Sequence, residues 1–381
     1  MEQEPKQKFG PGLWGVVSAS AFLGACLALS LWTGSPGEAS PAAAVSAAAL
    51  FEAPSQSVVH TSVPVEGKTV IPIGKAVGIK LFSDGVLVVG LSPVETEEGS
   101  CYPGRDCGLK EGDVITHING EEVDTIEQVQ AVVAQQRDTP LTIQAVRGQQ
   151  QLQLTVEAAE NSQGNYQLGI WLRDSMAGIG TMTFYDPDSG MFAALGHGIN
   201  DVDTAMLMPL ESGSIMPASV SDVKKGESGS PGELHGQFDL KKDLGTLYAN
   251  TELGIFGQMP LENLETTQQP VPVASREQVE VGHATILSNV RDDQVEEFDI
   301  EITKVYSTQE NTRNLMIQVT DPELLALTGG IVQGMSGSPI LQNGRLVGAV
   351  THVLVNDSTR GYGILAENMF RQATGSQAQA S

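Results

Sequence analysis

The sequence predicts a mainly β protein that has more than one folded domain behind an apolar N-terminal segment. Its 42 glycines and its aromatic content of only 5% are typical of a chain with many turns and short strands, and they argue against a helical bundle. The length of 381 residues allows two domains with separate cores, together with linkers. A formal net charge of -25 argues against nucleic acid as a partner, because phosphates would be repelled.

The first element is an apolar segment near the N-terminus. No charged residue occurs from Phe9 to Gly37, and Leu13 to Trp32 supplies about the 20 residues that a membrane-spanning helix needs. We therefore expect residues 1–12 to be cytoplasmic, residues 13–32 to form a transmembrane helix or signal anchor, and the rest of the chain to be exported. A cleaved signal peptide is the alternative, because the small residues 42–44 follow the apolar run.

The next segment, residues 33–69, is rich in alanine, serine, proline and valine without a lasting period. This composition predicts a flexible tether.

A compact unit is predicted over residues 70–158. Short β-prone runs alternate with glycines from Ala76 to Gly90. A helix is expected from Thr125, its N-cap, to Gln136, because apolar residues recur there at helical spacing. Two strands follow at 141–146 and 151–156.

Two stretches of this unit resemble the signature of a PDZ domain. Gly108-Leu109-Lys110-Glu111-Gly112-Asp113-Val114-Ile115 and Ile118-Asn119-Gly120 are similar to the pattern GLxxGDxIxxING. PDZ domains bind an extended peptide as an added strand, and the resemblance places the receiving strand at Val77-Gly78-Ile79-Lys80-Leu81. The alternative is that this strand contacts only the rest of its own chain.

Two cysteines remain outside the membrane segment. Cys101 and Cys107 flank a turn-rich stretch that is able to close a small disulfide loop in an oxidising compartment. Two unpaired thiols are the alternative, and the stretch lacks the second pair of ligands that a zinc site requires.

Residues 159–381 read as an all-β domain that carries a candidate nucleophile. In Gly334-Met335-Ser336-Gly337-Ser338-Pro339, glycines allow a sharp turn around Ser336, and the amides of Gly334 and Ser336 are candidates for an oxyanion hole. Two β-prone runs around an Asn343-Gly344 turn follow. A serine loop that leads into a hairpin predicts a β-barrel hydrolase.

A nucleophilic serine requires a base, and His197 is the first candidate. It ends an apolar run and lies between Gly196 and Gly198, which exposes the imidazole on a tight turn. A structural histidine is the alternative interpretation of His197. His352 is a rival base, because it lies on the strand that leaves the serine loop.

Asp321 is the candidate for the acid that orients the base. It follows a strand-like run and begins a short helical turn, so its alternative role is an N-cap with Pro322 at the first helical position. Asp201, Asp203 and Asp299 are possible substitutes.

A second serine loop, Gly226-Glu227-Ser228-Gly229-Ser230-Pro231-Gly232, repeats the Ser-Gly-Ser-Pro pattern. Charged neighbours indicate a solvated loop, and no apolar hairpin follows it. We therefore favour Ser336 over Ser228.

The second half of the chain as a whole resembles the stage IV sporulation protein B peptidase family. The resemblance, with the anchor and PDZ-like unit included, covers Leu13 to about Ala373. The motifs that carry it are Gly178 to Phe184, Ala194 to Ile199 with Asp201 and Asp203-Thr204, Gly329 to Pro339, and Gly348 to Val353 through Asn356-Asp357 to Gly361-Tyr362-Gly363.

This resemblance implies a serine endopeptidase with a trypsin-like double β-barrel, a triad of His197, Asp321 and Ser336, and no cofactor or metal. Two departures from trypsin-like chains are visible. Met335 stands where such chains usually have an acidic residue, and Asp321 lies unusually close to Ser336.

The resemblance also implies a biological setting, in which the enzyme is anchored in the forespore membrane and faces the intermembrane space. It would cleave a membrane-bound regulator there, release an intramembrane metalloprotease, and so activate a late mother-cell sigma factor. The alternative from another class is a catalytically inactive PDZ adaptor that binds extracytoplasmic partner segments.

Overall fold

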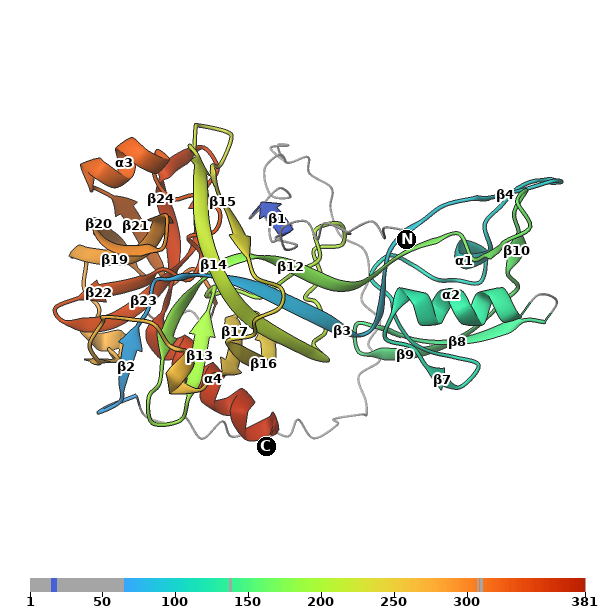
Figure 1. The fold of residues 1–381 in the computed structure, drawn as a ribbon, viewed down its shortest axis with the longest axis horizontal. Coiled ribbons are helices and arrows are strands. Elements are labelled where there is room, and N and C mark those ends of the chain that lie inside the picture. Colours follow the sequence, from blue (N-terminus) through green and yellow to red (C-terminus); the bar gives the residue numbers. More distant parts are fainter. Residues whose placement is uncertain (1–14, 19–64, 137–138, 307, 309–310, 381) are drawn as a thin grey trace, which may run out of the picture.

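The computed structural model describes residues 15–18, 65–136, 139–306, 308 and 311–380. Strands dominate these residues, which confirms the prediction of a mainly β protein. Two β-barrels lie at one end of the molecule, and a smaller β-rich unit with helix α2 lies at the other (Figure 1).

The first barrel forms because β14 pairs with β3 as well as with β16, so that six strands close into a ring. Its apolar interior includes the fully buried residues Ile79, Phe192 and Ile255. The six strands are β3 (Ala76–Leu91), β12 (Ile170–Tyr185), β13 (Met191–Ala194), β14 (Ser212–Lys224), β16 (Gly245–Thr251) and β17 (Gly254–Gln258).

The second barrel is also closed by six strands and carries Ser336 on the connection into β22. Helix α4 (Ala366–Ala380) directly follows the last strand of this barrel and packs on the first barrel, where Phe370 stacks on Phe184 of β12 with 6.1 Å between the ring centroids. The strands are β19 (Gly282–Arg291), β20 (Gln294–Val305), β21 (Leu315–Val319), β22 (Pro339–Gln342), β23 (Arg345–Leu354) and β24 (Asp357–Leu365), and α3 (Pro322–Thr328) follows β21.

The smaller unit contains the predicted helix, α2 (Ile126–Gln135), whose N-cap is Thr125 as expected. The Thr125 and Gln128 side chains form a reciprocal capping box. Val129 and Val133 of α2 are buried against the strands. The other elements are β4 (Val94–Thr96), β5 (Gly99–Cys101), α1 (Pro103–Asp106), β6 (Val114–Ile118), β7 (Glu121–Glu122), β8 (Leu141–Arg147), β9 (Gln150–Val156), β10 (Ala159–Glu160) and β11 (Tyr166–Gln167).

Strands β3 and β12 belong to both parts of the molecule and pair with each other along most of their length (Figure 1). Residues 76–82 of β3 lie in the first barrel, whereas Val86 and Leu87 pair with β6 of the smaller unit. The predicted domain boundaries at residues 70 and 159 therefore require correction, because 76–82 belong to the barrel, Ile71 and Ile73 pack into its core, and the start of β12 packs on the smaller unit.

The predicted peptide-binding strand is wrong for the same reason. Each residue from Val77 to Leu81 pairs with β12 on one side and with β14 on the other. A strand that is hydrogen-bonded along both edges has no free edge to which a peptide could add. These residues are instead a wall of the first barrel.

Shorter elements complete the fold. Within the predicted membrane segment the structure describes only Gly15–Ser18, as strand β1 antiparallel to β15. The rest of that segment and nearly all of the predicted tether lie outside the described residues. The remaining elements are β2 (Thr69–Pro72), β15 (Glu233–Phe238), β18 (Val271–Pro272) and two 3-10 turns at Leu261–Asn263 and Arg276–Gln278.

Candidate active site

The loop that carries Ser336 turns between α3 and β22. The Ser336 hydroxyl donates a hydrogen bond to the carbonyl oxygen of Thr351 on β23, at 2.8 Å. Among the described residues, the amides of Gly334 and Ser336 donate to no backbone carbonyl. The neighbouring Met335 side chain is fully buried in the apolar core, so packing replaces the usual acidic residue at this position.

Thr181 of β12 holds this loop against the first barrel. Its amide donates to the carbonyl of Ser336 at 3.1 Å, and its hydroxyl donates to the carbonyl of Gly334 at 2.7 Å. The Thr181 carbonyl in turn accepts from the amide of Leu195, two residues before His197. A Cβ on Gly337 would lie 2.1 Å from the Thr181 carbonyl oxygen, so only glycine permits this approach.

His197 follows β13 on a turn in which Leu195 and Gly196 both have positive φ. Its Nδ1 lies 2.8 Å from the carbonyl oxygen of Gly198. Because a carbonyl only accepts, this contact assigns the proton to Nδ1 and leaves Nε2 with the lone pair that a base requires. Burial lowers the pKa of His197, which keeps the imidazole neutral at physiological pH.

His352 lies beside His197, with 5.3 Å between the ring centroids. It directly follows Thr351, which accepts the bond from Ser336. Burial first, and then the nearby His197 and Arg313, lower the pKa of His352 to about 3. The structure therefore brings the predicted base, its rival and the predicted nucleophile to one place.

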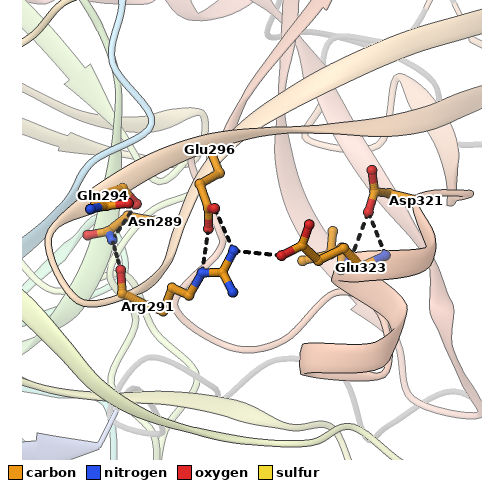
Figure 2. Close-up of polar contacts among 7 residues, drawn as sticks. Asn289, Arg291, Gln294, Glu296, Asp321 and Glu323 are labelled. Atoms are coloured by element: carbon orange, nitrogen blue, oxygen red, sulfur yellow. Dashed lines mark hydrogen bonds and ion pairs between the residues drawn. The ribbon is translucent and has the colours of Figure 1, made fainter.

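The Asp321 carboxylate has partners other than the His197 ring. One oxygen of its carboxylate accepts from the amides of Glu323 and Leu324 at 2.9 Å each, as an N-cap of α3, and the other accepts from the amide of Asp299. Figure 2 shows this carboxylate turned toward the first turn of α3. The sequence raised both roles for Asp321, and in this structure the carboxylate serves as the cap.

The three substitute acids also have other partners. Asp201 and Asp203 pair with Arg173, and Asp299 pairs with His283 near the surface. In the part of the chain that the structure describes, the hydrogen-bond partner of the His197 ring is the Gly198 carbonyl. Sequence reasoning missed this carbonyl and Thr181, although both lie in motifs that carry the family resemblance.

Ser228 lies apart from this cluster, as predicted. It is exposed, and its hydroxyl donates to the carbonyl of Asn356 at 2.9 Å. The hydrogen-bonded turn from Glu227 to Ser230 packs against the turn between β23 and β24.

Comparison with protein families decides the class of the chain. The family model described as SpoIVB peptidase S55 matches residues 164–370, which is more than half of the sequence. The chain belongs to the SpoIVB peptidase S55 family. As a member of this family it is a serine endopeptidase, and a model of the PDZ domain matches residues 101–147.

This S55 peptidase also resembles several solved structures. The HtrA-type protease AlgW, solved with a decapeptide, is 12% identical, with a TM-score of 0.33 and 54% of each chain covered. The active form of Rv3671c protease from M. tuberculosis is 15% identical, with a TM-score of 0.29, 54% of this chain covered and 75% of that one. The PDZ domain of the SdrC-like protein from Listeria monocytogenes is 22% identical, with a TM-score of 0.19, 23% of this chain covered and 87% of that one.

A protein of Vibrio cholerae that is named as a zinc metalloprotease is 25% identical in an alignment of 214 residues, and the match covers 49% of this S55 chain. The chain thus spans 45% of the length of that relative. In the described ranges no group of three or more His, Cys, Asp or Glu side chains is placed to hold a metal ion.

Two further predictions concern the cysteines and the membrane. Cys101 and Cys107 are both free thiols, which agrees with the alternative of two unpaired thiols and not with the possible disulfide. Their sulfurs lie near the carbonyls of Val94 and Gly104 instead. Among the helices that the structure describes in this S55 peptidase, none is long and apolar enough to cross a bilayer.

Proposed function

We propose that Ser336 is the nucleophile of this peptidase and that His197 is its base, with the amides of Gly334 and Ser336 as the oxyanion hole. The observation that carries the proposal is the shared anchoring of both residues by Thr181. This residue bonds to the serine loop on one side and to the turn that carries His197 on the other. Ser228 has no comparable connection to a histidine among the described residues.

The reaction follows from this arrangement. The Ser336 hydroxyl leaves the Thr351 carbonyl and transfers its proton to Nε2 of His197, while Oγ attacks the scissile carbonyl carbon. The two free amides stabilise the negative oxygen of the tetrahedral intermediate. The intermediate then expels the amine, which takes the proton from Nε2, and leaves an acyl-serine. Water attacks the acyl-serine with the same proton transfers and restores Ser336.

The Gly198 carbonyl orients the imidazole in this proposal, in the place where a carboxylate stands in a Ser-His-Asp triad. A carbonyl fixes the tautomer of His197 but contributes less charge than a carboxylate when the imidazolium forms. Asp321→Asn tests this assignment, because asparagine also caps helices well. We expect the acylation rate of Asp321→Asn to stay within about threefold of the wild-type rate, and a loss of a hundredfold or more would return Asp321 to the triad.

We further propose that the enzyme acts in sporulation signalling at a membrane, with its catalytic part exported. It would cleave a membrane-bound regulator and so release an intramembrane metalloprotease that activates a late sigma factor. Family membership and the uncharged run from Phe9 to Gly37 support this setting. The PDZ unit would bind a partner segment at a place other than the closed strand Val77–Leu81, and would raise the local concentration of the scissile bond.

The direct test measures cleavage of a peptide panel, together with labelling by a fluorophosphonate, which reacts with activated serines. Ser336→Ala should abolish both signals, and the matched variant Ser228→Ala should keep both. His197→Ala is expected to slow turnover far more than His352→Ala. Loss of turnover in Ser228→Ala with retention in Ser336→Ala would refute the assignment, and an unlabelled wild-type chain would favour an inactive adaptor.

A further inference from the structure

The start of β12 physically connects the PDZ unit to the catalytic region. Its residues Ile170 to Arg173 pair with the PDZ half of β3, and Arg173 lies opposite Leu87. The next residue, Asp174, accepts a hydrogen bond from the first amide of α2, that of Ile126, at 2.9 Å. This stretch is therefore fixed to both the sheet and the helix of the PDZ unit.

The Arg173 side chain extends from this stretch to the loop that follows His197. One guanidinium nitrogen forms an ion pair with Asp201, and another lies 2.7 Å from a carboxylate oxygen of Asp203. Asp201 is completely buried, whereas Asp203 is half-exposed. Arg173 is therefore the cation that neutralises a buried carboxylate close to the active site.

Asp201 organises the turn in which it lies. Its second carboxylate oxygen accepts from the amide of Asp203 and from both the amide and the hydroxyl of Thr204, at 2.8 to 3.1 Å. Its own amide donates to the carbonyl of Met206. The turn follows directly on Gly198 and Ile199, so it acts together with Asn250, whose Oδ1 accepts from the amide of Ile199 at 2.8 Å, in fixing the Gly198 carbonyl that orients His197.

A second contact links the same loop to the PDZ unit. Met206 lies over the signature loop, where a Cβ on Gly112 would come within 2.4 Å of the Met206 sulfur. The loop after His197 thus rests on the PDZ unit at Gly112 and is held by Arg173.

We infer that Arg173 is a positioning residue for His197, which acts through the buried carboxylate of Asp201 and transmits the state of the PDZ unit to the active site. The inference rests on the proposed role of His197 as the base. Without Arg173, Asp201 would be an unpaired buried charge, and its turn would have to rearrange toward water. The Gly198 carbonyl would move with the turn, and the His197 ring would lose its fixed tautomer.

The test uses the full-length chain in detergent micelles and compares Arg173→Ala with Arg173→Lys. The matched control is Arg105→Ala, which removes an exposed arginine that contacts Asp106 and the ring of Tyr102 within the PDZ unit. One readout is the rate at which a fluorophosphonate labels Ser336. The other is the nitrogen resonances of His197 in chain labelled with ¹⁵N-histidine, which distinguish a protonated Nδ1 from an unprotonated Nε2 and do not depend on turnover.

We expect Arg173→Ala to remain folded and to label about 10- to 100-fold more slowly, because small misplacements of catalytic groups cost rates of this order. Its His197 resonances should average between the two tautomers. Arg173→Lys should recover part of the rate, since lysine keeps the charge but lacks the planar fork of N–H donors with which Arg173 contacts Asp201 and Asp203. Arg105→Ala should match the wild type in both readouts.

Wild-type labelling and wild-type His197 resonances in Arg173→Ala would overturn the inference. If the wild-type chain itself is not labelled, the proposed function fails, and the His197 resonances still decide whether Arg173 positions the ring. A tautomer shift in Arg173→Ala then supports the inference, and unchanged resonances refute it.

Discussion

Thr181→Val is the sharpest perturbation of the proposed active site, because the substitution keeps the shape of the side chain and removes a single donor. Thr181 is 1% exposed, and its hydroxyl donates to the buried carbonyl of Gly334 at 2.7 Å. The backbone bonds of Thr181 to Ser336 and Leu195 do not involve the side chain and should persist. The variant therefore isolates the contribution of one hydrogen bond to the position of the serine loop.

The magnitude follows from the carbonyl that loses its partner. A buried acceptor left without a donor costs about 1–3 kcal/mol. The free energy of unfolding should fall by about that amount, which corresponds to a decrease in Tm of several degrees for a domain of this size. If the full free-energy cost also raises the activation barrier, because the serine loop is misaligned in the transition state, acylation slows by about 5- to 150-fold. A difference of about 1.4 kcal/mol in the barrier is a factor of ten in rate.

The assay is the rate of fluorophosphonate labelling of Ser336, measured beside thermal unfolding. Thr181→Ser is the control, because it keeps the donor and should label within about threefold of the wild type. Valine and serine variants that label at the same rate and unfold at the same temperature would refute the proposed role of this bond.

Three further predictions concern titration, the PDZ loop and the thiols. Burial chiefly lowers the pKa of His352 to about 3, so below about pH 6.5 the unfolded chain takes up a proton that the folded chain does not. Stability should then fall by up to about 1.4 kcal/mol per pH unit, and urea unfolding of His352→Gln at pH 7 and pH 5 should show a smaller loss than the wild type. Asp113→Ala should lower the free energy of unfolding by about 3 kcal/mol, because it leaves Arg147 without its fully buried partner, and an unchanged urea midpoint would contradict this. Burial raises the pKa of Cys107, so iodoacetamide should alkylate it more slowly in the folded chain than Cys101, and both should be modified after unfolding without a reductant.

Local signals predicted the local structure well. Thr125 and the apolar spacing after it specified helix α2, and Asn343-Gly344 specified the turn of the β22–β23 hairpin, where both residues have positive φ. The turns at the serine loop and at His197 were predicted from the glycines that surround them, because tight turns require particular residues at particular positions.

Long-range pairing was the part that could not be predicted. The sequence of β3 shows that it is apolar and extended, but nothing in residues 76–82 indicates that strands from far along the chain occupy both of its edges. The short runs expected between the glycines from Ala76 to Gly90 form one continuous strand, which passes through Gly85 with a positive φ. The role of Asp321 was open for a related reason, because a carboxylate before Pro322 suits a helix cap as well as a catalytic acid.

The shared strands also set an order for the assembly of the chain. Because Phe82 pairs with Ser212, the first barrel cannot close until the whole PDZ unit and the strand beyond it have been synthesised. Until then the apolar strand β3 has unpaired edges. Unpaired strand edges in an incomplete chain promote aggregation and proteolysis. The PDZ unit has mostly local pairings and its own core, so it should fold first and bring β3 and β12 together. The PDZ unit would then serve as the template on which the first barrel is built.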